Sequence, residues 1–178
     1  MKQCAIFLLI AIFFTFGLAG YKLFLSATHP IKYENLIIET SHKYNLDPKI
    51  IASLINVESS YNANAKSNKN ALGLMQIKLE TANYIAALNN EDSPTENHLY
   101  SPEINIKFGC MYLQYLNKKF KDIYTSLAAY NAGETRVRNW LNSNYSNDGI
   151  SLNFIPYKET ENYIKKIKNN LKFYSKIY

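Results

Sequence analysis

Hydrophobic residues recur with a helical period from about residue 31 onward. In the clearest case, Ile51, Leu54 and Ile55 occupy positions i, i+3 and i+4 and form one apolar face. Asp47-Pro48 combines a favourable N-cap residue with proline at the first helical position, which predicts that a helix begins at Pro48. Ser101-Pro102 repeats this signature and predicts the start of a longer helix.

The rest of the chain extends this helical pattern. Two polar loops, residues 62–71 and 142–153, interrupt it, and we find no run with the two-residue period of a strand. The sequence therefore predicts one all-α domain over residues 33–178, preceded by a linker over 26–32. The helices expected in it are Pro48–Ser59, Leu79–Leu88, Pro102–Phe120, Asp122–Tyr130, Glu134–Leu141 and Glu159–Tyr174.

The first 25 residues have a different character. Ala5–Tyr21 is a run of 17 uncharged residues between Lys2 and Lys22, which is near the lower limit for a helix that spans a bilayer. Gly17-Leu18-Ala19 offers a small-x-small cleavage site, so a single-pass membrane anchor and a cleaved signal peptide both stay open. Either one places the domain outside the cytoplasm, on the periplasmic or cell-wall side, and cleavage would give a secreted protein.

Composition excludes several classes of protein. Hydrophobic residues make up 47% of the 178 residues and charged residues 19%, which excludes wholesale disorder. Cys4 and Cys110 are too few and too far apart for a disulfide framework, and neither has the close Cys or His neighbours of a zinc site. We therefore expect no metal and no cofactor, and we expect Cys110 in the core.

The net charge of +6 is concentrated late in the chain. Lysines cluster between residues 158 and 176, within a predicted helix. Such a face suits cell-wall polymers, phospholipid head groups or nucleic acid, although a solvated helix face has the same appearance. Export would remove the usual nucleic-acid partner, so we expect none.

Glu58 is the first residue that suggests chemistry. It lies at i+7 on the apolar stripe that begins at Ile51, where it is either buried or at the lip of a cleft. Burial raises the pKa of a carboxyl, and the negative end of the helix dipole acts in the same direction. A carboxyl that stays protonated near neutral pH can act as the general acid for a glycosidic oxygen. From this pattern alone, a surface glutamate that ends its stripe is the alternative.

Four blocks of sequence, in order, then carry a resemblance to a known family. Together they resemble the catalytic domain of the soluble lytic transglycosylases, which is related in fold to goose-type lysozyme, and the resemblance covers Tyr33–Tyr174. The blocks are Glu58-Ser59 with Ser67, then Gly73-Leu74-Met75-Gln76-Ile77, then Ala129-Tyr130-Asn131-Ala132-Gly133 with Arg136–Leu141, and finally Ile155–Tyr163.

The resemblance implies a role for each matching residue. Glu58 would be the catalytic acid and base, and the substrate-binding residues would be Ser67, Met75, Gln76, Tyr130, Asn131 and Glu159. Gly73 and Gly133 are expected where the backbone needs a turn or a close approach. We expect Ser59 to support the helix end, Trp140 and its neighbouring arginines to serve packing and the surface, and the loop 142–153 to shape the groove.

The implied activity is that of a peptidoglycan lytic transglycosylase of the bacterial cell wall. Such an enzyme cleaves the β-1,4 bond between N-acetylmuramic acid (MurNAc) and N-acetylglucosamine (GlcNAc) without water and leaves 1,6-anhydroMurNAc ends. Two alternatives stay open: a lysozyme-type hydrolase with a second carboxylate that holds water, and a membrane-anchored module that binds the wall or serves a secretion machine. The expected partners are peptidoglycan glycan strands and, through the N-terminal segment, the cytoplasmic membrane.

Overall fold

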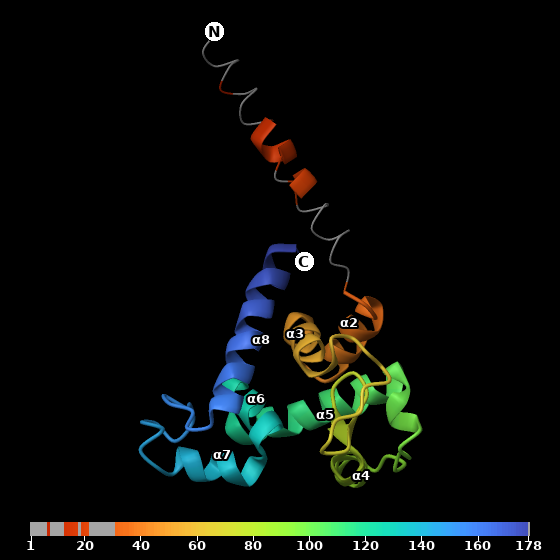
Figure 1. Cartoon of the computed structure of the whole chain (residues 1–178), viewed down its shortest axis with the longest axis vertical. Coiled ribbons are helices and arrows are strands. Elements are labelled where there is room, and N and C mark those ends of the chain that lie inside the picture. Colours follow the sequence, from red (N-terminus) through yellow and green to blue (C-terminus); the bar gives the residue numbers. More distant parts are fainter. Residues whose placement is uncertain (1–6, 8–12, 18, 22–30, 178) are drawn as a thin grey trace.

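The computed structural model describes residues 7, 13–17, 19–21 and 31–177 (Figure 1). The expected anchor or signal peptide over residues 1–25 and the linker over 26–32 fall largely outside the described residues. Within the described part of the chain, no helix has both the length and the apolar character needed to cross a membrane. The membrane segment therefore stays a prediction.

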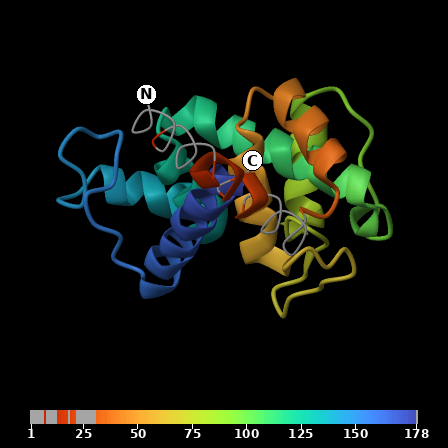
Figure 2. The same cartoon turned by 90° about the horizontal axis from the view of Figure 1, so that it is seen from above.

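From Ile31 onward the chain is mostly helical, as the sequence predicts. Figures 1 and 2 show the long helix α5 crossing the middle of the domain, with the other helices arranged around it. The elements are α2 (Glu34–Lys43), α3 (Pro48–Ser59), β1 (Ala71–Leu72), β2 (Ile77–Lys78), α4 (Leu79–Leu88), the 3-10 helix η1 (His98–Tyr100), α5 (Pro102–Phe120), α6 (Ile123–Ala132), α7 (Glu134–Leu141) and α8 (Lys158–Ile177).

The capping signals are confirmed by the helix starts. The Asp47 carboxylate accepts a hydrogen bond from the backbone N–H of Lys49 at 2.8 Å, so α3 begins at Pro48. Helix α5 begins at Pro102 and ends at Phe120, as expected. Helix α6 begins one residue later than predicted because Asp122 stands outside it as the N-cap and accepts from the N–H of Thr125 at 2.7 Å.

The prediction of a domain without strands was wrong in one detail. Strands β1 and β2 pair antiparallel, with Ala71 opposite Lys78 and Leu72 opposite Ile77. Each strand has two residues, and an alternation that needs at least four residues cannot be seen in so short a run. This small hairpin forms one side of the groove described below.

The core joins the helix pairs that the site depends on. Helix α3 packs along α8, and α5 packs against α2, α4 and α6. The apolar stripe of α3, formed by Ile51, Leu54 and Ile55, is fully buried, and so is Cys110 on α5, as expected. The residues of this core lie between Ile37 and Ile167. The part of the chain from α2 to α8 therefore buries a core of its own.

A buried asparagine holds the hairpin turn against α5. The side-chain amide of Asn105 donates to the carbonyls of Leu72 at 2.8 Å and Leu99 at 2.7 Å, and its carbonyl accepts from the N–H of Met75 at 2.7 Å. Gly73 has a φ of +71°, and a Cβ on it would lie 2.3 Å from the Asn105 amide nitrogen. The expected backbone role of Gly73 is confirmed, because any side chain there would displace this anchor.

Candidate active site

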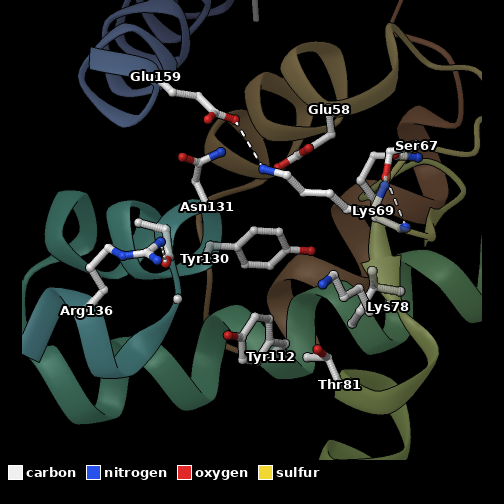
Figure 3. Close-up of a pocket in the computed structure, with 15 residues that line it drawn as sticks. Glu58, Ser67, Lys69, Lys78, Thr81, Tyr112, Tyr130, Asn131, Arg136 and Glu159 are labelled. Atoms are coloured by element: carbon white, nitrogen blue, oxygen red, sulfur yellow. Dashed lines mark hydrogen bonds and ion pairs between the residues drawn. The ribbon is translucent and has the colours of Figure 1, made fainter. Parts of the chain in front are cut away.

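A cavity of about 450 Å³ lies where α3, the hairpin, α4, α5, α6, α7 and α8 meet (Figure 3). It brings together residues that are up to 101 positions apart in the sequence, from Glu58 to Glu159. Its lining residues are Glu58, Ser67, Lys69, Ala71, Gln76, Ile77, Lys78, Thr81, Tyr112, Tyr130, Asn131, Ala132, Gly133, Arg136 and Glu159. Six of the seven candidate residues are among them, and the exception is Met75.

Glu58 occupies the last turn of α3, at the inner end of the apolar stripe. Burial in this position raises the pKa of its carboxyl to about 7, and a hydrogen bond from the Tyr163 hydroxyl partly opposes that rise. The raised pKa is the property that the helix pattern predicts for a carboxyl at this position. A group with this pKa is protonated in a large fraction of molecules near neutral pH, so it can donate a proton there.

Tyr163 forms a hydrogen bond with Glu58, and the sequence pattern does not reveal this contact. It lies on α8, is 7% exposed, and donates from its hydroxyl to the Glu58 Oε1 atom at 2.6 Å. Burial raises the pKa of the tyrosine well above its ordinary value, so its proton stays in place. The residue belongs to the last of the four blocks, four positions after Glu159, but only the packing of α8 on α3 brings it to the carboxyl.

Tyr130 and Met75 interact with each other. The Tyr130 hydroxyl donates to the backbone carbonyl of Met75 at 2.8 Å, so its proton is directed to the hairpin turn. The Met75 side chain is fully buried and lies outside the cavity lining. Met75 thus contributes its backbone, which connects the Asn105 anchor to the tyrosine, while its expected role in substrate binding stays a prediction.

Ser67 and Gln76 line the cavity and also organise the loop around it. The Ser67 hydroxyl accepts from the N–H of Ala71 at 3.0 Å, and its own proton can be donated to a ligand. The Gln76 amide nitrogen donates to the carbonyls of Ala65 at 3.2 Å and Gly73 at 2.9 Å. The Gln76 amide oxygen is therefore the part of this side chain that can accept a hydrogen bond from a ligand.

Asn131 and Glu159 stand on the opposite side of the cavity, near the start of α8 (Figure 3). The Asn131 side-chain oxygen accepts from the buried Thr160 hydroxyl at 2.8 Å, which leaves its amide N–H groups for other partners. The Glu159 side chain is 74% exposed and forms an ion pair with Lys69 at 3.8 Å. This ion pair links the 62–71 loop to α8.

The structure adds Lys69, Lys78, Thr81, Tyr112 and Arg136 to the candidate residues. Arg136 lines the cavity, so the expectation that the arginines beside Trp140 serve packing and the surface does not describe this arginine fully. In the sequence, Tyr112 looks like a core residue because it lies within the apolar pattern of α5. The described residues hold no group of three or more His, Cys, Asp or Glu side chains that could bind a metal ion.

Three further expectations have outcomes in the structure. Ser59 donates to the Leu74 carbonyl at 2.8 Å and Trp140 is 6% exposed, so both have the supporting roles predicted for them. Gly133 joins α6 to α7 with a φ of +94°, which confirms its backbone role. The loop 142–153 contributes no residue to the lining of this cavity, and its groove-shaping role stays a prediction.

The fold and the site together define a class of protein: a helical domain with an open groove, polar groups along the groove, and one partly buried carboxyl with a raised pKa. The profile of the family described as "Transglycosylase SLT domain" matches residues 35–153, which is more than half of the chain. The chain belongs to this family.

Curated relatives and solved structures agree with this assignment. The chain is 40% identical over 114 residues to membrane-bound lytic murein transglycosylase E of Buchnera aphidicola from Acyrthosiphon pisum, covering 59% of this chain and 52% of the relative. It is 31% identical to the protein of the same name from Buchnera aphidicola of Baizongia pistaciae, covering 92% and 89%. The 70 kDa soluble lytic transglycosylase of Escherichia coli matches with a TM-score of 0.73 and 31% identity, over 84% of this chain and 25% of that one.

The chain is much shorter than some of these relatives. It spans about half of the first of them, and 22% of the soluble lytic murein transglycosylases of Salmonella typhimurium and Escherichia coli. The comparisons therefore establish the family and the lysozyme-like helical fold, and the activity of this chain is argued separately below.

Proposed function

We propose that this chain is a peptidoglycan lytic transglycosylase that cleaves the MurNAc–GlcNAc β-1,4 bond and leaves 1,6-anhydroMurNAc ends. The observation that carries the proposal is the Glu58 carboxyl, which lines the groove and has its pKa raised to about 7 by burial. The names of the relatives, lytic murein transglycosylases of both membrane-bound and soluble types, support the same activity.

The first step uses Glu58 as an acid. Its carboxyl gives a proton to the oxygen between MurNAc and GlcNAc, the C1–O bond breaks, and GlcNAc leaves with a free 4-hydroxyl. The positive charge that develops at C1 of MurNAc is stabilised by the acetamido oxygen of the same sugar. Tyr163, donating to Oε1, holds the carboxyl so that the other oxygen can carry the transferred proton.

The second step uses the same group as a base. The Glu58 carboxylate takes the proton of the MurNAc C6 hydroxyl, O6 bonds to C1, and the 1,6-anhydro ring closes. Glu58 is protonated again at the end, so no water is consumed and the acid is ready for another strand. A pKa near 7 suits both steps, because neither the acid nor the base form is rare at neutral pH. We expect Ser67, Gln76 and Asn131 to orient the sugars through the groups that the protein leaves unused.

The two-carboxylate hydrolase has one candidate partner within the cavity lining. Ordinary glycosidases pair the acid with a second carboxylate that acts as nucleophile or holds water. Glu159 is the other carboxylate among the lining residues, but it is 74% exposed and paired with Lys69. This environment favours a binding role for Glu159 over activation of water.

Mass spectrometry of a digest of purified peptidoglycan tests the proposal. We expect anhydromuropeptides from the wild-type chain, none from Glu58→Gln, and slower formation of the same products from Glu159→Gln. Reducing-end muropeptides that disappear in Glu159→Gln would replace this proposal with a lysozyme-type hydrolase. A folded wild-type chain that binds the wall without cleaving it would favour the binding or assembly module.

The location of the enzyme is part of the same proposal. An anchor over residues 1–25 would hold the domain at the outer side of the cytoplasmic membrane, within reach of the glycan strands. Relatives named as membrane-bound support this location. Fractionation of cells that express the full chain tests it, because a cleaved signal peptide would release the domain from the membrane fraction.

A further inference from the structure

A continuous series of tyrosines leads out of the cavity. The ring centroids of Tyr130 and Tyr112 are 5.1 Å apart, those of Tyr112 and Tyr115 are 6.4 Å apart, and those of Tyr115 and Tyr84 are 5.8 Å apart. The first two rings line the cavity, and the last two do not. The series therefore begins at the candidate site and ends beyond it.

Helix geometry explains why this series continues the groove. Thr81 of α4 and Tyr112 of α5 both line the cavity, and Figure 3 shows them toward the same end of it. Tyr84 and Tyr115 each follow one of these residues by three positions on the same helix, and residues three apart share a helix face. Tyr84 and Tyr115 thus extend the surface formed by Thr81 and Tyr112, one helical turn further along.

Tyr84 is exposed, yet it is held in place. Tyr84 is 50% exposed, and its hydroxyl oxygen lies 3.0 Å from that of Tyr115. Tyr115 donates to Glu134 at 2.9 Å, and Lys119 donates to the Tyr115 hydroxyl and to Glu134, both at 2.6 Å. Because Tyr115 uses its proton on Glu134, Tyr84 donates its own to Tyr115.

A tyrosine that serves only packing has a different environment in this protein. Tyr61 also bonds to another tyrosine hydroxyl, that of Tyr174, but Tyr61 is 7% exposed and Tyr174 is 6% exposed. The Tyr84 ring is oriented by a comparable bond and remains open to solvent. An orientated ring with an open face loses little conformational entropy when a flat ligand binds to it.

We propose that Tyr84 and Tyr115 form a second sugar-binding position, which holds the glycan strand where it leaves the active-site cavity. The ligand is a β-1,4-linked chain of N-acetylated amino sugars. The C–H face of one sugar would stack on the exposed Tyr84 ring, and its hydroxyls would reach the Tyr84 hydroxyl and the charged groups of Glu134 and Lys119. The inference rests on the proposed function, because it takes the strand that the cavity cleaves as its ligand.

Calorimetric titration of the full chain in detergent tests this position without catalysis. All variants carry Glu58→Gln so that no strand is cut. The probes are a disaccharide of GlcNAc and MurNAc, which is short enough to lie within the cavity, and a dodecasaccharide, which is long enough to extend past Tyr84. We expect Tyr84→Ala to weaken dodecasaccharide binding about fivefold and to leave disaccharide binding unchanged.

Two further variants sharpen the result. Tyr84→Phe keeps the ring but loses the hydroxyl that orients it, so it should bind the dodecasaccharide more weakly than the Tyr84-containing chain and more tightly than Tyr84→Ala, because stacking is retained. Tyr33→Ala removes a tyrosine that is 37% exposed at the start of α2 and should change neither titration. The inference is overturned if Tyr84→Ala weakens the binding of both probes equally or weakens the binding of neither. It is also overturned if Tyr84→Phe loses as much affinity for the dodecasaccharide as Tyr84→Ala does.

The inference and the proposed function can fail separately. If the wild-type chain releases anhydromuropeptides and Tyr84→Ala shows no dependence on strand length, the second sugar position is wrong and the activity stands. If the wild-type chain releases none, while Tyr84→Ala selectively weakens dodecasaccharide binding, the activity is wrong and the sugar position stands.

Discussion

Two carboxyls of this protein each accept a hydrogen bond from a tyrosine, and their pKa values move in opposite directions. At the end of α3, Tyr163 donates to Glu58 at 2.6 Å, and burial still raises the pKa of that carboxyl to about 7. At the start of α7, Tyr115 donates to Glu134 at 2.9 Å, and the pKa of Glu134 is lowered.

The difference lies in the cations and not in the tyrosines. Burial raises the pKa of Glu134 as well, but hydrogen bonds from Lys119, Tyr115 and Arg138 together outweigh that rise. Within the described residues Glu58 forms no ion pair, and the cavity cation Lys69 is paired with Glu159 instead. A neighbouring tyrosine therefore does not make a carboxyl a general acid, whereas burial without a paired cation does.

The largest expected effect is on catalysis by Glu58→Gln. The variant should lose about 10³-fold or more in the release of anhydromuropeptides, because the amide can neither donate the first proton nor accept the second. Its circular dichroism spectrum should stay that of the wild-type chain. The matched control is Glu80→Gln, an exposed glutamate on α4 outside the cavity lining, which should retain full activity. Turnover by Glu58→Gln near the wild-type rate would remove Glu58 from the mechanism.

The next effect is on the pH dependence of stability. The carboxyl of Glu58 has a pKa of about 7 in the folded chain and an ordinary value of 4.5, so the folded state binds more protons between these values and stability falls as pH rises. The shift corresponds to about 3 kcal/mol. In urea unfolding, the free energy of unfolding of Glu58→Gln should therefore rise by about 3 kcal/mol relative to that of the wild-type chain between pH 4.5 and pH 8. Parallel stability curves for the two chains would contradict the raised pKa.

A smaller effect is expected from Tyr163→Phe. Loss of this hydrogen bond removes the one interaction that lowers the pKa of Glu58, so the pKa should rise further and the alkaline limb of the activity profile should move to higher pH. The rate at its optimum should fall about tenfold, because the carboxyl loses its fixed orientation. The matched control is Tyr174→Phe, another buried tyrosine of α8 whose hydroxyl contacts Tyr61. If both variants shift the profile equally, Tyr163 has no specific positioning role.

The smallest effect concerns Glu134, the other member of the comparison. Its pKa is lowered in the folded chain, so it adds stability above its ordinary pKa, and this contribution disappears as pH falls through the lowered value. Glu134→Gln should therefore cost about 1 kcal/mol at pH 7 and almost nothing in acid, as measured by urea unfolding. This sign is opposite to that of Glu58→Gln. If Glu134→Gln instead gains stability relative to the wild-type chain as pH rises, the cations do not control this carboxyl.

Much of the fold follows from local signals. The starts of α3 and α5 are read from Asp47-Pro48 and Ser101-Pro102, because a cap and a proline act within one turn of the helix. The stripe on α3 likewise reveals that Glu58 sits beside buried residues. The hairpin was missed, because its strands have two residues each and are held by Asn105 from α5, which no local pattern encodes.

The site divides in the same way. Glu58 and the polar residues of the four blocks are visible in the sequence, and most of them line the cavity. Tyr163, Tyr112 and Arg136 were not predicted as site residues, since helical periodicity assigns a residue to a face but not to the element opposite that face. The resemblance implies that Met75 binds substrate, and only the packed turn shows that its backbone bonds Asn105 and Tyr130.

The sequence by itself determined most of the helices and the position of a carboxyl at the end of an apolar stripe, because caps and periodicity depend on residues a few positions apart. The tertiary structure alone decided which tyrosine meets that carboxyl, which lysine joins the local partner Arg138 at the other one, and hence which of the two keeps its proton near neutral pH. The physical reason is that desolvation and charge pairing depend on distances through space, and these are set only when α8 packs on α3 and α7 packs beside α6.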